Sequence, residues 1–136
     1  MEVVFTDTHD TLLDGRYLIL RRLGQGAFGE VFLTRHVGLG VYRAVKRIRK
    51  SKDVHNTRRK EADALKNLRH TSLPIIYDID EDDVYFYIVE EYIEGISLSE
   101  YVRDRTRLAQ DETCGIIMSI CTVLSYCLLY TSDAAD

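Results

Sequence analysis

Three features of the sequence combine the residue types needed to hold a chain of phosphates. The segment Gly24-Gln25-Gly26-Ala27-Phe28-Gly29 is rich in glycine, so its backbone can lie close to a ligand. Lys46, in the segment Arg43-Ala44-Val45-Lys46, supplies a positive charge, and Glu61 falls in a later helical pattern. Backbone N–H groups of such a loop bind phosphate oxygens. The combination predicts a triphosphate-binding site.

The residues on either side of the glycines predict a hairpin of two strands, at residues 17–23 and 30–36. Their β-branched and aromatic content favours strands. A dinucleotide-binding unit would instead need a helix directly after Gly29 and an acidic residue about 20 positions later to hold a ribose. Lys46 to Arg49 occupy that position. Because an arginine there would suit a 2′-phosphate, the dinucleotide alternative stays open.

A further strand is expected at residues 41–48. Its alternation places Tyr42, Ala44, Lys46 and Ile48 on one face. The small Ala44 leaves room for a flat base, and Lys46 projects a charge towards its phosphates. The alternative is that Lys46 is one more solvated cation in a basic segment.

A helix is expected at residues 54–69, with Glu61 on its apolar face. The other residues of that face are Val54, Leu65 and Leu68. A carboxylate turned inward needs a cation, since an unpaired buried charge is costly. Lys46 is the candidate partner whose strand face suits it. Alternatively, Glu61 lies at the margin of the face and pairs locally with Arg58 or Lys60.

Residues 17–126 resemble the first half of a eukaryotic-like protein kinase domain, nearest in style to bacterial serine/threonine kinases. The handful of matching motifs comprises the glycine loop with Val31, the lysine segment and the helix glutamate. Lys46 matches the lysine that holds the α- and β-phosphates of ATP, and Glu61 matches its helix partner, so these are the expected catalytic residues. Arg43 departs from the family pattern, which has valine there.

The resemblance implies an α+β fold: a five-stranded antiparallel sheet with one packed helix, then the first helices of an incomplete helical lobe. Residues 17–90 would form the N-lobe, 91–95 the hinge and 96–126 the start of the C-lobe, after a lead-in at residues 1–16. Short and long helices are expected at 98–105 and 111–124, respectively. The expected nucleotide-binding residues are Leu23, Gly24, Gln25, Gly26, Ala27, Phe28, Gly29, Val31, Ala44, Lys46, Glu91 and Ile93.

In the family, backbone groups at the positions of Glu91 and Ile93 bond the adenine edge, and Leu23, Val31 and Ala44 would cover the base. Glu90 is a departure, because the family usually keeps an apolar or small residue just before the hinge. One hypothesis is that Glu90 competes with Glu61 for Lys46 or bonds a nearby backbone group. The alternative is that its side chain is solvated.

Residues 127–136 resemble translated sequencing adapter, so we expect a non-native tail. The catalytic aspartate and magnesium ligands of the family would lie beyond residue 126, so no metal ligand is assigned here and the chain itself is expected to be inactive. The resemblance implies ATP and Mg²⁺ as cofactors and a protein hydroxyl as substrate. A pseudokinase-type interaction module and, less favoured, a dinucleotide-dependent oxidoreductase remain alternatives. Small-molecule phosphotransferases, whose domains have the same arrangement of lobes, are a further alternative.

Composition fits one globular domain. The chain has 136 residues, 46% hydrophobic and 29% charged, and a net charge of −4 that gives no reason to expect nucleic acid. No apolar run is expected to span a membrane and no signal peptide opens the chain, so we expect a cytoplasmic protein, with membrane attachment only through downstream segments. Cys114 and Cys121 fit no metal-ligand spacing.

Overall fold

The computed structural model describes residues 10–27, 29–51, 60, 62–105 and 107–131. The chain divides into two compact units. The first comprises residues 1–67 and 74–92, and the second comprises residues 68–73 and 93–136. The predicted nucleotide-binding residues lie in the first unit, except for Ile93.

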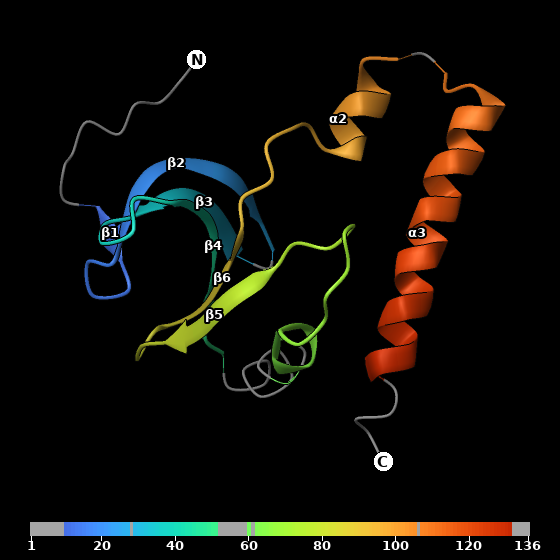
Figure 1. The fold of residues 1–136 in the computed structure, drawn as a ribbon. Coiled ribbons are helices and arrows are strands. Elements are labelled where there is room, and N and C mark those ends of the chain that lie inside the picture. The colour runs from blue at the N-terminus through green and yellow to red at the C-terminus, as the bar shows by residue number, and fades with distance from the viewer. Residues whose placement is uncertain (1–9, 28, 52–59, 61, 106, 132–136) are drawn as a thin grey trace. The chain divides into compact units, whose positions relative to one another are not determined.

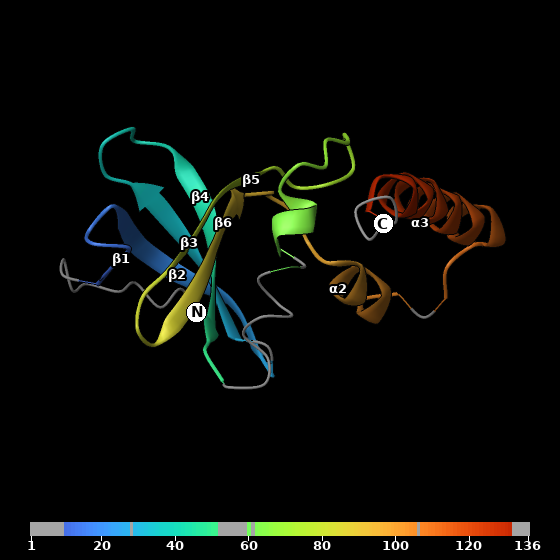
Figure 2. The ribbon, with the colours of Figure 1, turned by 90° about the horizontal axis from the view of Figure 1, so that it is seen from below.

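The first unit is built on one antiparallel sheet with the strand order β1-β2-β3-β4-β6-β5. Figures 1 and 2 show that this sheet is strongly curled. The strands are β1 (Thr11–Leu12), β2 (Tyr17–Gly26), β3 (Gly29–His36), β4 (Tyr42–Arg49), β5 (Ile76–Glu81) and β6 (Tyr85–Glu91). The predicted hairpin and the strand around Lys46 are confirmed. The expected α+β plan is also confirmed, although the sheet has six strands instead of the expected five.

The sixth strand is β1, which is formed by residues expected to belong to the lead-in. It has two residues and pairs Thr11 with Leu18 and Leu12 with Tyr17. Leu12 is 5% exposed and joins the core. Two residues are too few to show the alternation by which a strand is recognised in a sequence.

The two faces of the sheet carry different cores. The first core lies on the face that we call the closed face, which bears Val45, Tyr87 and Val89, and it also contains Leu12, Tyr17 and Phe32. The second core contains Ile48, Phe86 and Ala62. Ile48 and Phe86 are cross-strand partners on the opposite face. Val45 and Val89 are fully buried, so the closed face is the better packed of the two.

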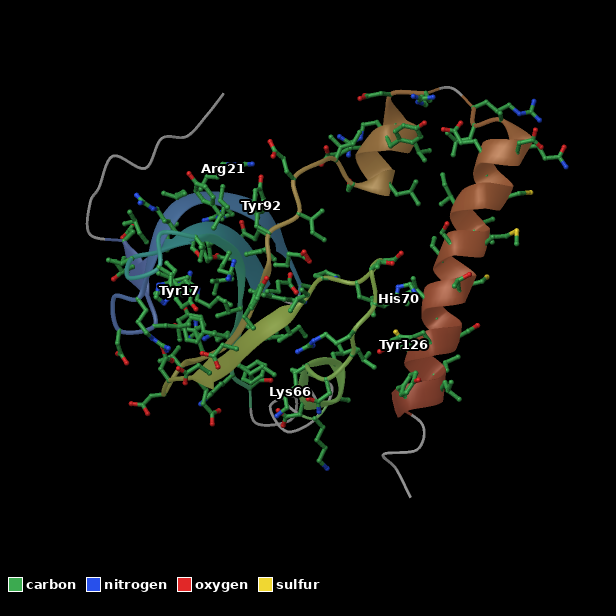
Figure 3. All side chains as sticks on the ribbon, in the orientation of Figure 1. Tyr17, Arg21, Lys66, His70, Tyr92 and Tyr126 are labelled. Carbon is green, nitrogen blue, oxygen red and sulfur yellow. The ribbon has the colours of Figure 1, made fainter. Side chains whose placement is uncertain are left out.

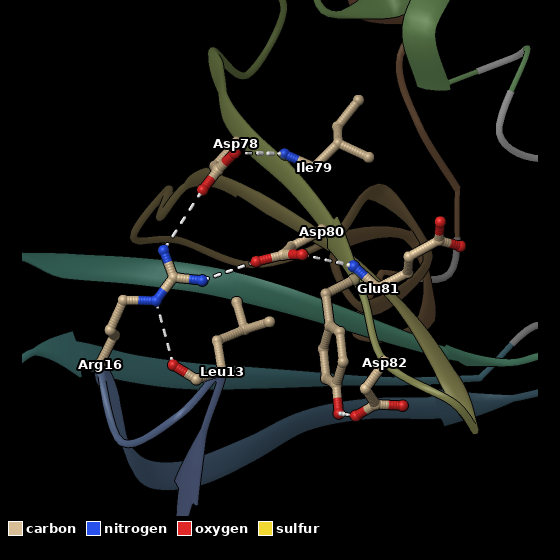
Figure 4. Close-up of polar contacts among 8 residues, drawn as sticks. Leu13, Arg16, Asp78, Ile79, Asp80, Glu81 and Asp82 are labelled. Carbon is tan, nitrogen blue, oxygen red and sulfur yellow. Dashed lines mark hydrogen bonds and ion pairs between the residues drawn. The ribbon is translucent and has the colours of Figure 1, made fainter.

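Polar contacts of Arg16, which we call the polar clamp, join the two ends of the curled sheet. Arg16, in the turn between β1 and β2, reaches β5 at the far end of the strand order, where its guanidinium lies 2.7 Å from the Asp80 carboxylate and 3.7 Å from that of Asp78 (Figure 4). The Arg16 Nε also donates to the Leu13 carbonyl at 3.0 Å. Leu13 and Asp14 have positive φ angles of 53° and 56°, so the clamp holds a turn that these residue types seldom adopt.

The helix expected at residues 54–69 is shorter among the residues that the structure describes. Residues 62–65 are helical, and Ala62, at 2% exposed, packs against Ile48 and Phe86. Residues 54–59 and Glu61 lie outside the described residues. The expected apolar face is wrong at Leu65, which is 44% exposed, while Leu68 is buried but lies beyond the helical turns. The pattern failed because the helix ends before Leu68 would complete its face.

The second unit contains two helices, α2 (Leu98–Arg103) and α3 (Gln110–Thr131). Ser97 caps α2 by accepting the Glu100 N–H at 3.1 Å. The segment 68–73 lies beside α3: the Arg69 N–H donates to the Tyr126 hydroxyl at 2.8 Å, and the His70 and Tyr126 rings lie 5.2 Å apart (Figure 3). Both predicted helices are confirmed, and α3 continues seven residues past its expected end at Leu124.

The expectation that no apolar run is long enough to span a membrane is wrong. Residues Gln110–Tyr130 form a helical stretch of sufficient length, with a mean hydropathy of 1.8 over 18 residues and none of that window buried. Asp111 and Glu112 place two charges at the start of this helix, but no residue from Thr113 to Tyr130 is charged. Length and composition by themselves do not distinguish a membrane span from an apolar helix of a soluble domain.

Candidate nucleotide-binding site

The glycine segment forms the tip of the β2–β3 hairpin. Gly24 pairs with Val31, Gln25 with Glu30, and Gly26 with Gly29, so that the strand pairing continues to the tip of the hairpin. Phe28 itself lies outside the described residues. The strand that begins at Gly29 excludes the helix that a dinucleotide-binding unit would need there. The hairpin prediction is therefore confirmed, and the oxidoreductase alternative is wrong.

The three glycines of the loop have different surroundings. A Cβ added at Gly24 or Gly26 would meet nothing within 4 Å, so the backbone there is open to a ligand. At Gly29 an added Cβ would lie 2.2 Å from the Arg47 carbonyl oxygen, and the φ angle is +128°. Gly29 is therefore required by the packing of β3 on β4, whereas Gly24 and Gly26 leave room for phosphates.

Lys46 and Ala44 share one face of β4, as predicted. In the register, Lys46 lies opposite Val31 on β3 and Ile88 on β6, and Ala44 lies opposite Glu90. We call this the lysine face, defined by Val31, Ala44, Lys46 and Glu90. Ala44 is 5% exposed, so it presents a small apolar surface beside the charged side chain. The arrangement suits a flat base next to a phosphate-binding cation.

The sequence predicts that two glutamates, Glu61 and Glu90, lie near Lys46, and the structure describes only Glu90. Glu61 lies outside the described residues, so its pairing with Lys46 stays a prediction. The neighbouring Ala62 packs against Ile48, which lies on the same face of β4 as Lys46. Glu90 is half-buried on the lysine face. Burial raises the pKa of the Glu90 carboxyl, and the Lys46 charge opposes that rise.

The other predicted residues are not part of the lysine face. Leu23 falls at a register shift between Arg22 and Gly24 and has no paired partner in β3. The Gln25 side chain accepts from Arg22 at 2.8 Å. The Glu91 N–H donates to the Ile75 carbonyl at 2.8 Å, so this N–H is already paired within the sheet. Ile93 is exposed and belongs to the second unit.

A pocket of about 420 Å³ adjoins the glycine loop, but it does not include Ala44 or Lys46. It is lined by Gln25, Gly26, Ala27, Gly29, Glu30, Arg47, Ile48, Arg49, Ser51 and Tyr85. Glu30, Arg47 and Tyr85 belong to the closed face in the strand register. The structure therefore brings the loop residues together with the closed face here, and this pocket differs from the base pocket that the sequence predicts.

Sequence reasoning missed an ion pair that braces the base of the loop. The Arg47 guanidinium lies 2.8 Å from the Glu30 carboxylate, and its plane sits over Tyr85 and Phe32 at 4.6 Å and 5.0 Å from the ring centres. Glu30 and Arg47 are direct cross-strand partners. The opposite charges of Glu30 and Arg47 on adjacent expected strands could have suggested this ion pair, but the sequence does not show the register that places them opposite each other.

Comparisons with known proteins agree with this geometry. The family model described as protein kinase domain matches residues 17–130. The serine/threonine-protein kinase PrkC of Bacillus subtilis is 32% identical over 118 residues, which cover 84% of this chain and 18% of that protein. The carbon catabolite-derepressing protein kinase of Candida tropicalis is 32% identical over 117 residues, which cover 83% of this chain and 19% of the relative.

CBL-interacting protein kinase 1 of rice is 29% identical over 117 residues, which cover 83% of this chain and 25% of that relative. The chain thus spans a quarter or less of the length of these relatives. The family match includes the glycine hairpin, β4 and all of α3 except Thr131. On the hairpin, the lysine face and this match, the chain belongs to the protein kinase domain family.

Proposed function

We propose that this chain supplies the ATP-binding part of a protein serine/threonine kinase, which transfers the γ-phosphoryl group of ATP to protein hydroxyls. The observation that carries the proposal is the lysine face, where Val31, Ala44 and Lys46 lie next to one another in the strand register. They also lie beside a hairpin tip whose Gly24 and Gly26 leave open space. The names of the relatives support the reaction class.

The residues of this chain would divide the work of holding ATP. The loop backbone would offer N–H groups to phosphate oxygens, and the Lys46 ammonium would neutralise the α- and β-phosphates. Ala44 and Val31 would cover the base, while backbone groups of Glu91 would bond its edge. Pairing with Glu61 would hold Lys46 in place.

ATP supplies the phosphoryl group that is transferred, and Mg²⁺ offsets the charge of the phosphates during transfer. Within the described part of the chain, no three His, Cys, Asp or Glu side chains are grouped as a metal site would need. We assign no metal ligand and no catalytic base to these 136 residues. We propose that the isolated polypeptide binds nucleotide. We further propose a cytoplasmic setting, where ATP and protein substrates are available.

The test is a titration of the chain with a fluorescent ATP analogue. Lys46→Met should weaken binding about tenfold or more, because it removes a charge-assisted contact of about 1.5–3 kcal/mol. Lys50→Met is the matched control, since Lys50 pairs with Glu81 at 3.1 Å and not with the site. Equal losses in the two variants, or no binding by the unaltered chain, would refute the proposal.

Transfer itself must be measured in a complete protein that contains this chain. Phosphorylation of protein serine or threonine that disappears with Lys46→Met is the expected result. A complete protein that binds ATP but transfers no phosphate would instead be a nucleotide-binding interaction module.

A further inference from the structure

The strand register places a second charged side chain beside Lys46. Along the β4–β6 pair, Ala44 lies opposite Glu90, and Lys46 lies opposite Ile88. Directly opposed residues share a face of the sheet, so Lys46 and Glu90 are diagonal neighbours on the lysine face. Diagonal positions are about 7–8 Å apart, which long side chains can bridge. Glu90 is therefore placed to act on the same lysine that would hold the phosphates.

The surroundings of Glu90 make this carboxylate sensitive to its charged neighbour. Ala44 and Ile76 lie opposite it on β4 and β5, and both are apolar. Burial raises the pKa of Glu90, and Lys46 lowers it. A carboxylate removed from water is costly unless a cation compensates it.

The described strands bring few other charged or titratable groups to this face near Glu90. On β4 the other diagonal neighbour is Tyr42, which is 56% exposed, and Arg35 lies opposite Tyr42 on β3. From β5, Ile76 and Ile79 face this side. No ion pair within 4.0 Å joins Lys46 and Glu90 in the described part, so their attraction acts over a longer separation. The Lys46 charge lowers the pKa of Glu90, although burial has the larger effect and the pKa stays raised.

We propose that Glu90 is a positioning residue whose carboxylate attracts the Lys46 ammonium across the lysine face, so that nucleotide phosphates compete with it for this charge. The proposal rests on the proposed function, because it concerns the same lysine. Glu90 then lowers the affinity for nucleotide, and when no nucleotide is bound it competes with Glu61 for Lys46. Removing the carboxylate charge should strengthen nucleotide binding, whereas shortening the side chain to Asp should preserve part of the competition.

The first experiment needs no nucleotide. The pKa of Glu90 is measured by NMR in the 136-residue chain labelled with ¹³C at the glutamate carboxyls, with Glu90→Gln used to assign the signal. Lys46→Met should raise the pKa of Glu90 by about 1 unit, while Lys46→Arg should leave it nearly unchanged. Lys50→Met is the control and should not move it. An unchanged Glu90 titration in folded Lys46→Met would overturn the proposal.

The second experiment compares the affinity for a fluorescent ATP analogue. Glu90→Gln should bind about three- to tenfold more tightly than the unaltered chain at pH 7.5, since one competing charge is gone. Glu90→Asp should stay close to the unaltered chain. The advantage of Glu90→Gln should shrink towards one as the pH falls and Glu90 takes up its proton. A role in folding alone would not produce this dependence on pH.

The outcomes separate the two proposals. Equal affinity of Glu90→Gln and the unaltered chain at every pH would overturn the role of Glu90 and leave ATP binding intact. A shifted Glu90 titration in Lys46→Met without any binding of ATP would support the coupling of the two side chains and refute the proposed function.

Discussion

Described polar side chains on the closed face of the sheet pair closely with one another, whereas Lys46 and Glu90 on the lysine face do not. On the closed face, Arg47 pairs with Glu30 at 2.8 Å, and the Tyr87 hydroxyl donates to Asp82 at 2.7 Å. On the lysine face, Lys46 and Glu90 are set among Val31, Ala44 and Ile88. Within the described residues, this second pair has no contact within ion-pair distance.

The difference indicates which polar side chains stabilise the fold and which ones remain available to a ligand. Polar groups whose partners are met inside the protein have little to gain from a ligand, and they rigidify the sheet. A lysine charge that lies among apolar residues is screened less than one in water, so it attracts a bound anion more strongly. The closed face therefore acts as the scaffold of the lysine face.

The strongest way to break this arrangement is a change at Gly29, where the loop packs against β4. Gly29→Ala should destabilise the first unit by about 3 kcal/mol, since the added Cβ meets the Arg47 carbonyl and the backbone is left-handed. Gly26→Ala is the matched control: it should leave stability within about 0.5 kcal/mol and weaken nucleotide binding. Urea unfolding and the ATP-analogue titration measure the two effects. Similar stabilities of the two variants would contradict the packing argument.

A smaller loss is expected from the clamp that closes the curl. Arg16→Ala should cost about 1 kcal/mol, because it removes a half-exposed ion pair with Asp80 and a bond to the Leu13 carbonyl. Arg49→Ala, an exposed arginine at the end of β4, is the control and should change stability little. Urea unfolding of the two variants provides the measurement. Loss of nucleotide affinity without loss of stability in Arg16→Ala would show that the two faces are not separable.

Acid should act on the closed face through Asp82. Burial raises the pKa of Asp82, but the hydrogen bonds from the Tyr85 N–H, the Tyr87 hydroxyl and the Val84 N–H together outweigh it and leave the pKa below its ordinary value of 3.8. Asp82 therefore stabilises the fold above that pH, and the contribution is lost as the pH falls through the lowered value. Asp82→Asn should flatten this part of the pH profile of urea unfolding. A profile that stays parallel to that of the unaltered chain below pH 4 would count against it.

The lysine face should show the opposite slope, with a smaller effect. Since the pKa of Glu90 is raised above its ordinary value of 4.5, its contribution to stability is present below that pH and declines as the pH rises through the raised value. Glu90→Gln should remove this decline, so its stability at pH 7 should equal or exceed that of the unaltered chain. Urea unfolding between pH 4 and 8 tests the sign. A Glu90→Gln chain that is clearly less stable at pH 7 would contradict it.

Much of the sheet could be predicted because its strands are long enough to show alternation. The glycine hairpin and the shared face of Ala44 and Lys46 follow from spacing and a period of two. The two-residue β1, the early end of the helix and the apolar length of α3 were not predicted. The pairing of β1 and the end of the helix depend on tertiary packing, which a local reading of the sequence does not capture. In α3, no charged residue marks where the apolar stretch ends.

Of the site, the strand register confirms the shared face of Ala44 and Lys46 that the alternation predicted, while the binding roles of these residues and of Val31 stay predictions. The sequence also marked Glu90 as a departure from the family pattern. It did not identify the pair of Glu30 and Arg47, because register links residues 17 positions apart. It also did not anticipate that the pocket beside the loop would be lined by residues of the closed face.

The acidic residues that receive Arg16 have a second effect on β5, the last strand in the sheet order. Asp78 accepts the N–H of Ile79 at 2.9 Å, and Asp80 accepts the N–H of Glu81 at 2.8 Å (Figure 4). Donors that are occupied in this way are withdrawn from a strand of another molecule, and the two carboxylates would repel an incoming backbone carbonyl. Natural sheets use charged residues at their margins to prevent edge-to-edge aggregation. The same residues that close the curl thus protect the sheet from adding a foreign strand.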